Sequence, residues 1–158
     1  MEKERKVFRS RFSVLLIGII LTLLLPGFIP IFIHKTYQVM YILGGIFVFI
    51  LLIYSGIRYV ISEGKLYLKI WSIPTCSLKI SDIASMERSY DIFDIPTNTT
   101  ASFKKLRLQF VRDTKYPYIH VSPVREQEFI EELKKINPNI YVSFYDKKGI
   151  GRILDWDI

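Results

Sequence analysis

The feature that most constrains this chain of 158 residues is the long apolar stretch 12–57. Tyrosines aside, its only ionisable side chains are His34 and Lys35, which lie near its middle. A bilayer core is about 30 Å thick, so a spanning helix needs about 20 apolar residues. The stretch is long enough for two such helices, and the sequence therefore predicts a transmembrane helical hairpin with a short connection at 34–38.

The first of these two spans is interrupted. Residues 12–25 are apolar and cover about 21 Å at the helical rise of 1.5 Å per residue. Pro26 and Pro30 follow, and proline removes a helix hydrogen bond and bends or ends the helix. Two interpretations stay open: the first span is kinked and continues to about residue 33, or it ends near Leu25.

The second span, 39–57, contains a pair of adjacent glycines, Gly44 and Gly45. Small residues let membrane helices approach closely, so this pair is a candidate for helix packing, on the first span or on a second copy of the chain. The alternative is that glycine is simply common in membrane helices. Tyrosines near the ends of the spans have the positions of an aromatic belt at the water boundary: Tyr37, Tyr41, Tyr54 and Tyr59.

Positive charge gives the hairpin an orientation. Basic side chains gather in 1–11 and again after 57, whereas the central connection carries Lys35. The positive-inside rule then predicts a multi-pass protein of the cell's inner (plasma) membrane, with both termini in the cytoplasm. We interpret 1–11 as a basic cytoplasmic N-terminus and the first apolar run as an uncleaved anchor. The net charge of +7 beside a membrane segment favours anionic lipid headgroups as a partner over nucleic acid.

From residue 58 the apolar side chains recur at every second position, which is typical of strands. The clearest runs are 65–71, 75–80, 86–90 and 104–112, and 115–121 is expected to pair back as a hairpin. The period then changes to that of a helix, which we expect to begin at Ser122 and Pro123 and to end near Ile136. Short strands followed by one amphipathic helix predict an α+β domain, and the tail 141–158 has the pattern of a β-hairpin.

Three segments in this order resemble a known family. They are ISDIASMERS at 80–89, KKLRLQFV at 104–111, and IHVSPVREQEFIEELKKINPNI at 119–140. Together with two preceding spans, they are similar to the bacterial PH-domain family, in particular its YyaB-like type. The resemblance implies that 58–140 forms a PH-like antiparallel β-barrel or sandwich closed by one C-terminal α-helix. It also implies a module that binds lipid headgroups or protein segments.

No set of residues in the sequence is typical of a catalytic or metal site. The single cysteine, Cys76, excludes an intrachain disulfide and a cysteine-based zinc site, and is expected to be a small buried side chain. His34 is expected in solvent, and His120 is expected to point outward from a strand in a structural role. We therefore predict a protein that is not an enzyme and needs no metal or cofactor.

Outward-pointing basic side chains on the strands are the candidate binding residues. Each basic side chain near an anionic leaflet contributes about 1 kcal/mol to association. The alternative is an ordinary solvated face with lysines that protect a sheet edge. The predicted contacts to an anionic headgroup or membrane surface are Lys65, Lys69, Lys104, Lys105 and Arg107.

Two functions follow as hypotheses. The first is a membrane-anchored PH-like binding or scaffold module that faces the cytoplasm and binds a protein partner, another copy of itself, or anionic lipid headgroups. The second is an accessory subunit of a membrane enzyme or transporter, which would act through its transmembrane hairpin. The chain carries no recognition motif for nucleic acid.

Overall fold

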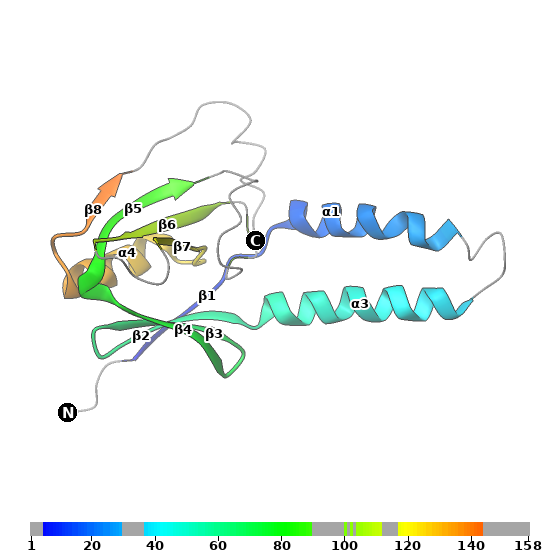
Figure 1. The fold of residues 1–158 in the computed structure, drawn as a ribbon, viewed down its shortest axis with the longest axis horizontal. Coiled ribbons are helices and arrows are strands. Elements are labelled where there is room, and N and C mark those ends of the chain that lie inside the picture. The colour runs from blue at the N-terminus through cyan, green and yellow to red at the C-terminus, as the bar shows by residue number, and fades with distance from the viewer. Residues whose placement is uncertain are drawn as a thin grey trace.

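A pair of helices extends from one side of a domain that contains two β-sheets (Figure 1). The computed structural model describes residues 5–29, 37–89, 100, 102, 104–111 and 117–143. The predicted tail hairpin therefore lies outside the described residues, apart from its first positions. So do most of the predicted connection at 34–38 and the strand start at 115–116.

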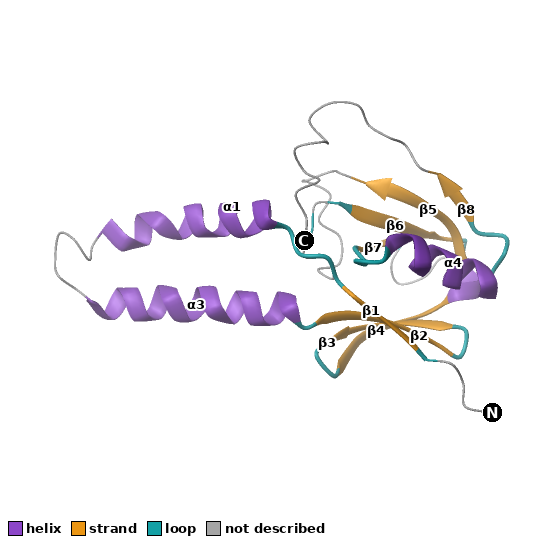
Figure 2. Cartoon of the chain, turned by 180° about the vertical axis from the view of Figure 1, so that it is seen from behind, coloured by secondary structure: helices purple, strands orange, loops and turns teal. Residues whose placement is uncertain are grey.

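The two helices of the pair run side by side, as opposite views show (Figures 1 and 2). Helix α1 spans Val14–Leu24 and α3 spans Tyr37–Ser55. A 3-10 turn, η1 at Leu25–Phe28, continues α1 through Pro26, so the helical backbone does not stop at Leu25. Proline has no N–H for the α-helical bond, which accounts for the tighter turn.

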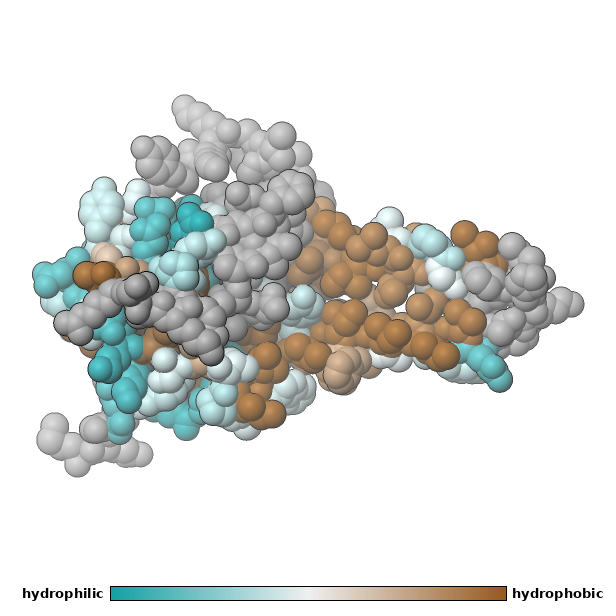
Figure 3. Space-filling model, viewed as in Figure 1, coloured by the Kyte–Doolittle hydropathy of each residue, from teal (hydrophilic) through white to brown (hydrophobic). Residues whose placement is uncertain are grey.

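Apolar side chains cover both helices, and hydrophilic side chains gather on the domain (Figure 3). By length and composition one described helix, Gln38–Ser55, is able to cross a membrane; its mean hydropathy is 2.1 and none of it is buried. Val14–Gly27 is a shorter apolar helix. Exposure of so many apolar side chains is costly in water and favourable in lipid.

The first sheet has four antiparallel strands in the order β1-β2-β3-β4. Their bounds are Lys6–Arg9, Ile57–Ser62, Lys65–Ile70 and Ile73–Lys79. The sequence prediction placed 1–11 outside the domain, whereas the structure builds Lys6–Arg9 into its first sheet. This strand is too short to show a clear alternation, and its inward residue, Phe8, is the one that packs in the core.

The hairpin is inserted between two strands that pair with each other. Strand β1 precedes α1, β2 follows α3, and Arg9 lies opposite Arg58 in the register of the pair. The ladder continues to the hairpin, because the Ser10 N–H donates to the Ile57 carbonyl at 3.1 Å. Both helices therefore leave the same end of the same sheet.

The second sheet has the order β7-β6-β5-β8, with strands at Tyr118–Val121, Lys105–Phe110, Ile83–Ser89 and Tyr141–Ser143. Strand β8 pairs with β5 in parallel, so the arrangement is not wholly antiparallel. The two sheets are not closed into a barrel, and of the two predicted forms, barrel or sandwich, the structure is the sandwich.

The core lies between the two sheets, and α4 closes it at Glu126–Ile136 (Figures 1 and 2). The leucines predicted to point inward from β3 and β6 are buried, but Lys105 at the start of β6, which was predicted to point outward, is buried as well. A short 3-10 turn, η2 at Ile80–Asp82, links the sheets. The core residues of largest volume are Tyr59, Phe8, Phe129, Leu66, Leu68, Ile80, Ile83, Met86, Leu106, Leu108, Ile119 and Leu133.

Helix α4 begins later than predicted, at Glu126, although it ends at Ile136 as expected. Ser122 and Pro123 are extended residues that run beside β1 and do not cap the helix. The Val124 N–H donates to the Arg9 carbonyl at 3.0 Å, so this segment extends the first sheet. After the helix, the Asn137 side-chain amide donates to the carbonyls of Ile80 and Ile83, both at 3.1 Å.

Candidate functional site

Three basic side chains lie in one row across the first sheet, close to the hairpin. Arg9 on β1 is in register with Arg58 on β2, and Arg58 is in register with Lys69 on β3. We call these residues the cationic row. They lie on the outer face of the sheet, because the alternate positions, such as Phe8 and Leu68, are buried in the core. Neighbouring like charges at directly opposite strand positions repel each other.

Among the residues that the structure describes, the cationic row has no acidic neighbour that would neutralise it. Within the part of the chain that the structure describes, no carboxylate lies at ion-pair distance from Arg9, Arg58 or Lys69. Arg9 and Arg58 are exposed to solvent, and Lys69 is half-buried. The row is therefore a concentrated positive charge that is open to an external anion.

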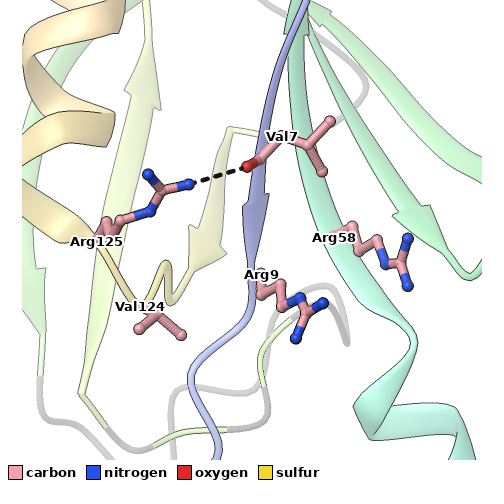
Figure 4. Close-up of a pocket in the computed structure, with 5 residues that line it drawn as sticks. All are labelled: Val7, Arg9, Arg58, Val124 and Arg125. Atoms are coloured by element: carbon pink, nitrogen blue, oxygen red, sulfur yellow. Dashed lines mark hydrogen bonds between the residues drawn. The ribbon is translucent and has the colours of Figure 1, made fainter.

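Arg9 and Arg58 line a pocket of about 400 Å³ together with Val7, Val124 and Arg125. Figure 4 shows the side chains of Arg9 and Arg58 pointing the same way, while Arg125 lies on the other side of β1. The Arg125 Nη2 donates to the Val7 carbonyl at 3.4 Å (Figure 4). The pocket thus joins the first sheet to the segment that precedes α4.

Arg125 is held by contacts on three sides. Besides the Val7 carbonyl, its Nη1 lies 2.8 Å from the Glu128 carboxylate, and its guanidinium lies 5.4 Å from the centre of the Phe8 ring. Nearby, the Arg11 Nη2 donates to the Val124 carbonyl at 3.3 Å. Arg11 and Arg125 therefore fix the backbone around the pocket and leave Arg9 and Arg58 as its available cations.

A cluster of buried hydroxyl groups joins the segments that carry the pocket residues. The Tyr59 hydroxyl donates to the Ser10 Oγ at 3.2 Å, and the Ser10 and Ser122 Oγ atoms are 2.9 Å apart. Burial raises the pKa of Tyr59 above its ordinary value of 10.0, against the lowering effect of its hydrogen bonds to Ser10 and Ser122. The phenol therefore stays protonated, and it joins β1, β2 and the segment before α4.

Trp71 forms the other notable feature beside the hairpin. It adopts a φ of 58°, in the turn between β3 and β4, and its Nε1 donates to the Leu52 carbonyl of α3 at 3.1 Å. A Cβ at Gly56 would lie 2.3 Å from the indole, so glycine is needed for this contact. Trp71 and Ile73 are 51% and 69% exposed. Exposed aromatic and apolar side chains at a helix end are typical of a membrane interface.

The predicted binding residues do not form one surface. Lys65 and Lys69 lie on the outer face of the first sheet, whereas Arg107 lies on the outer face of the second, where its guanidinium is 4.2 Å from the Tyr118 ring centre. Because the inner faces share one core, these outer faces point in opposite directions. Lys104 precedes the second sheet's β6, and Lys105 is only 8% exposed, so it is not the outward side chain that was predicted.

Other predicted positions also differ from expectation. His120 was expected to point outward, but it is 1% exposed and packs edge-to-face on Tyr118, with ring centres 5.5 Å apart. Tyr59 was expected at the water boundary and is instead fully buried. Cys76 was expected to be buried and is half-buried. Among the described residues, no group of three His, Cys, Asp or Glu side chains is placed to hold a metal ion.

The glycine pair of α3 does not pack on α1 in this structure. A Cβ added at Gly44 or Gly45 would meet nothing described within 4 Å. The close approach of the helices occurs instead at Gly27, where a Cβ would lie 2.6 Å from the Leu43 Cδ1. The prediction that the pair packs on a second copy stays a prediction.

Sequence reasoning missed the residues that matter most in this site, namely Arg9, Arg58 and Arg125. One signal was available: Arg9 and Arg58 stand just outside the two ends of the apolar stretch. A hairpin brings its two ends together, so basic residues that flank it on both sides are expected to become neighbours. Arg125 had no comparable signal, because its place depends on the chain path before α4.

Two packed sheets closed by one helix are the arrangement of a PH-like domain. A family model described as a bacterial PH domain matches residues 57–137, about half of the chain. The chain therefore belongs to the bacterial PH-domain family, as the resemblance predicted. Searches of curated proteins and of solved structures found no match. The matched region begins at β2, so β1 and the hairpin lie outside it.

Proposed function

We propose that this protein is a membrane-held binding module whose hairpin fixes a PH domain at the cytoplasmic face of a bacterial plasma membrane. The observation that carries the proposal is the insertion of the hairpin between β1 and β2, which pair with each other. Membership of the PH-domain family supports a binding role.

The connection between hairpin and domain supports a fixed position. Ser13 caps α1 by accepting a hydrogen bond from the Leu16 N–H at 3.4 Å, and it is itself buried. At the other helix, Gly56 separates α3 from β2, and the Trp71 N–H donates to its carbonyl at 2.6 Å. Neither junction is a flexible linker of the Gly/Ser-rich type. The end of the first sheet would then lie where the apolar helices end, at the level of the lipid headgroups.

Membrane lipid is the first candidate ligand in this proposal. The basic residues that flank the hairpin support the orientation with both termini in the cytoplasm, where anionic lipids attract them. A protein partner or a second copy of the chain would reach the same exposed face of the first sheet. We also propose that the domain is of the YyaB-like type within the bacterial PH-domain family.

The accessory-subunit hypothesis has one observation in its favour. Gly44 and Gly45 leave an open face on α3, and large apolar side chains such as Tyr41, Ile42 and Phe49 are exposed on the same helix. A second membrane helix would fit against such a face. In that case the hairpin would make the main contacts with the enzyme or transporter, and the domain would have a supporting role.

Photo-crosslinking from two positions separates these functions. A photoreactive residue replaces Tyr67, on the outer face of β3, or Tyr41, on the exposed surface of α3, in cells that produce the full chain. The binding module predicts a discrete crosslinked lipid or protein at Tyr67. A protein crosslink at Tyr41 alone would favour the accessory subunit.

The membrane placement is tested with the same cells. We expect the chain to stay in the membrane pellet after alkaline carbonate extraction, and its domain to be cut by protease only in inverted vesicles. Release by carbonate, or cleavage of the domain from the outside of intact spheroplasts, would contradict the proposal.

A further inference from the structure

We infer that the cationic row and the adjoining pocket bind the phosphate group of an anionic lipid in the leaflet that the hairpin enters. This inference rests on the proposed membrane placement and adds to it a site, a ligand class and named contacts. The binding atoms are the guanidinium groups of Arg9 and Arg58, with Lys69 next to Arg58 in the row.

The first argument is the charge of the row. Two arginines and a lysine occupy directly opposite positions on three strands, although the described part of the chain gives them no acid partner. Like charges at such positions destabilise a sheet. An anion between them would convert the repulsion into attraction. Guanidinium groups are suited to phosphate because their planar donors form two parallel hydrogen bonds to it.

The second argument is the shape of the site. The pocket volume of about 400 Å³ lies within the range of small-ligand sites. Val7 and Val124 give it apolar walls, which suit the glycerol part of a lipid beside its phosphate. Arg125 is occupied by Glu128 and by the Val7 carbonyl, so it supports the wall, and the binding falls to Arg9 and Arg58.

The third argument is position. Arg58 lies just after the end of α3, and Arg9 lies shortly before the start of α1. The exposed Trp71 and Ile73 stand on the neighbouring turn, where they would enter the membrane interface. The row is thereby placed at headgroup depth. A soluble phosphate compound offers the same chemistry, and the experiment must separate the two sources.

The test uses the full chain in a mild non-ionic detergent, titrated with short-chain phosphatidylglycerol, phosphatidylcholine or inorganic phosphate. Bound lipid is counted by native mass spectrometry. Each basic side chain near an anionic lipid contributes about 1 kcal/mol, so two of them account for a factor of about 30. We expect the Arg9→Gln/Arg58→Gln variant to bind phosphatidylglycerol at least about tenfold more weakly than the natural chain.

The chain offers a matched control. Lys79 on β4 and Lys134 on α4 are exposed lysines outside the cationic row. The Lys79→Gln/Lys134→Gln variant loses the same charge, and we expect its affinity to change by less than about twofold. An Arg9→Lys/Arg58→Lys variant keeps the charge but loses the planar guanidinium donors. We therefore expect its affinity for phosphatidylglycerol to lie between the affinities of the other two variants.

Several outcomes would overturn the inference. One is an equal loss in the row variant and in the control, because binding would then reflect net charge alone. Another is equal affinity for phosphatidylcholine and phosphatidylglycerol. Displacement of the lipid by inorganic phosphate at the same concentration would assign the site to soluble phosphate compounds. In each of these cases carbonate-resistant membrane association would persist if the proposed function is right, so the two failures are distinguishable.

Discussion

The backbone N–H of Ser122 donates a hydrogen bond to the hydroxyl of Tyr59 at 3.0 Å. This contact joins two segments that are far apart in sequence: the strand that follows the hairpin and the extended segment that leads into α4. It also explains why the helix does not begin at Ser122, whose side chain and backbone are both turned toward the buried cluster. The pocket depends on the same contact, because Val124 and Arg125 follow directly.

Replacing Tyr59 with phenylalanine should therefore destabilise the domain. The Ser122 N–H would lose its acceptor inside the core, and a buried unsatisfied donor costs about 1–3 kcal/mol. We expect a loss of that size in the free energy of unfolding, measured for the full chain in detergent. Tyr67→Phe, on the outer face of β3, is the control and should change it by less than about 0.5 kcal/mol. Equal stability of the two variants would contradict the role given to the cluster.

The same cluster predicts a response to alkaline pH. Burial raises the folded-state pKa of Tyr59 above 10.0, so the folded chain holds this proton more tightly than the unfolded chain. Its contribution to stability is full below pH 10.0 and is lost as the pH rises through the raised value. Thermal unfolding from pH 8 to 11 should show a steeper alkaline loss for the natural chain than for Tyr59→Phe. If the stability of the two chains fell in parallel with rising pH, the raised pKa of Tyr59 would be contradicted.

An acid response should come from Glu132. Hydrogen bonds from Lys135 and Lys6 lower the pKa of Glu132 below its ordinary value of 4.5, and the Lys6 contact, at 2.9 Å, ties β1 to α4. The carboxylate contributes stability above pH 4.5, which is lost as the pH falls through the lowered value. Glu132→Gln should remove this part of the acid dependence and cost about 1 kcal/mol or less at neutral pH. An unchanged acid profile would contradict the assignment.

The contact between Gly56 and Trp71 gives a prediction about the junction between α3 and the first sheet. In Gly56→Ala the new Cβ would meet the indole, which the Leu52 carbonyl holds in place, so we expect a loss of about 1–3 kcal/mol. Gly44→Ala, where a Cβ meets nothing described within 4 Å, is the control and should be neutral or slightly stabilising. Thermal unfolding in detergent measures both. A stable Gly56→Ala would show that the turn adapts freely.

Alternation predicted the inner faces of the sheets well, because burial on one face imposes a period of two. Leu66, Leu68, Leu106 and Leu108 are buried as expected. The same rule was wrong for His120, which is buried although its position in the strand predicted exposure. A period of two separates the two faces of one sheet, but it does not show which other segments cover the outer face.

The candidate site was much less accessible to prediction. Of the cationic row, only Lys69 was among the predicted contacts, because it stands on a regular strand. Arg9 and Arg58 are separated in sequence by the whole hairpin. Strand β1 is too short for its pattern to predict the strand with which it pairs. The site exists only after long-range pairing, which no local pattern specifies.

The insertion of the hairpin between β1 and β2 has a consequence for biosynthesis. During translation Lys6–Arg9 leaves the ribosome first, and its partner Ile57–Ser62 follows only after both helices have been made. The first sheet therefore cannot gain its edge strand until both helices have been made and have turned back. In the membrane placement proposed above, a chain with a misdirected helix would keep these strands on opposite sides of the bilayer, without the Arg9–Arg58 pair. Under that proposal, assembly of the first sheet requires the correct topology of the hairpin.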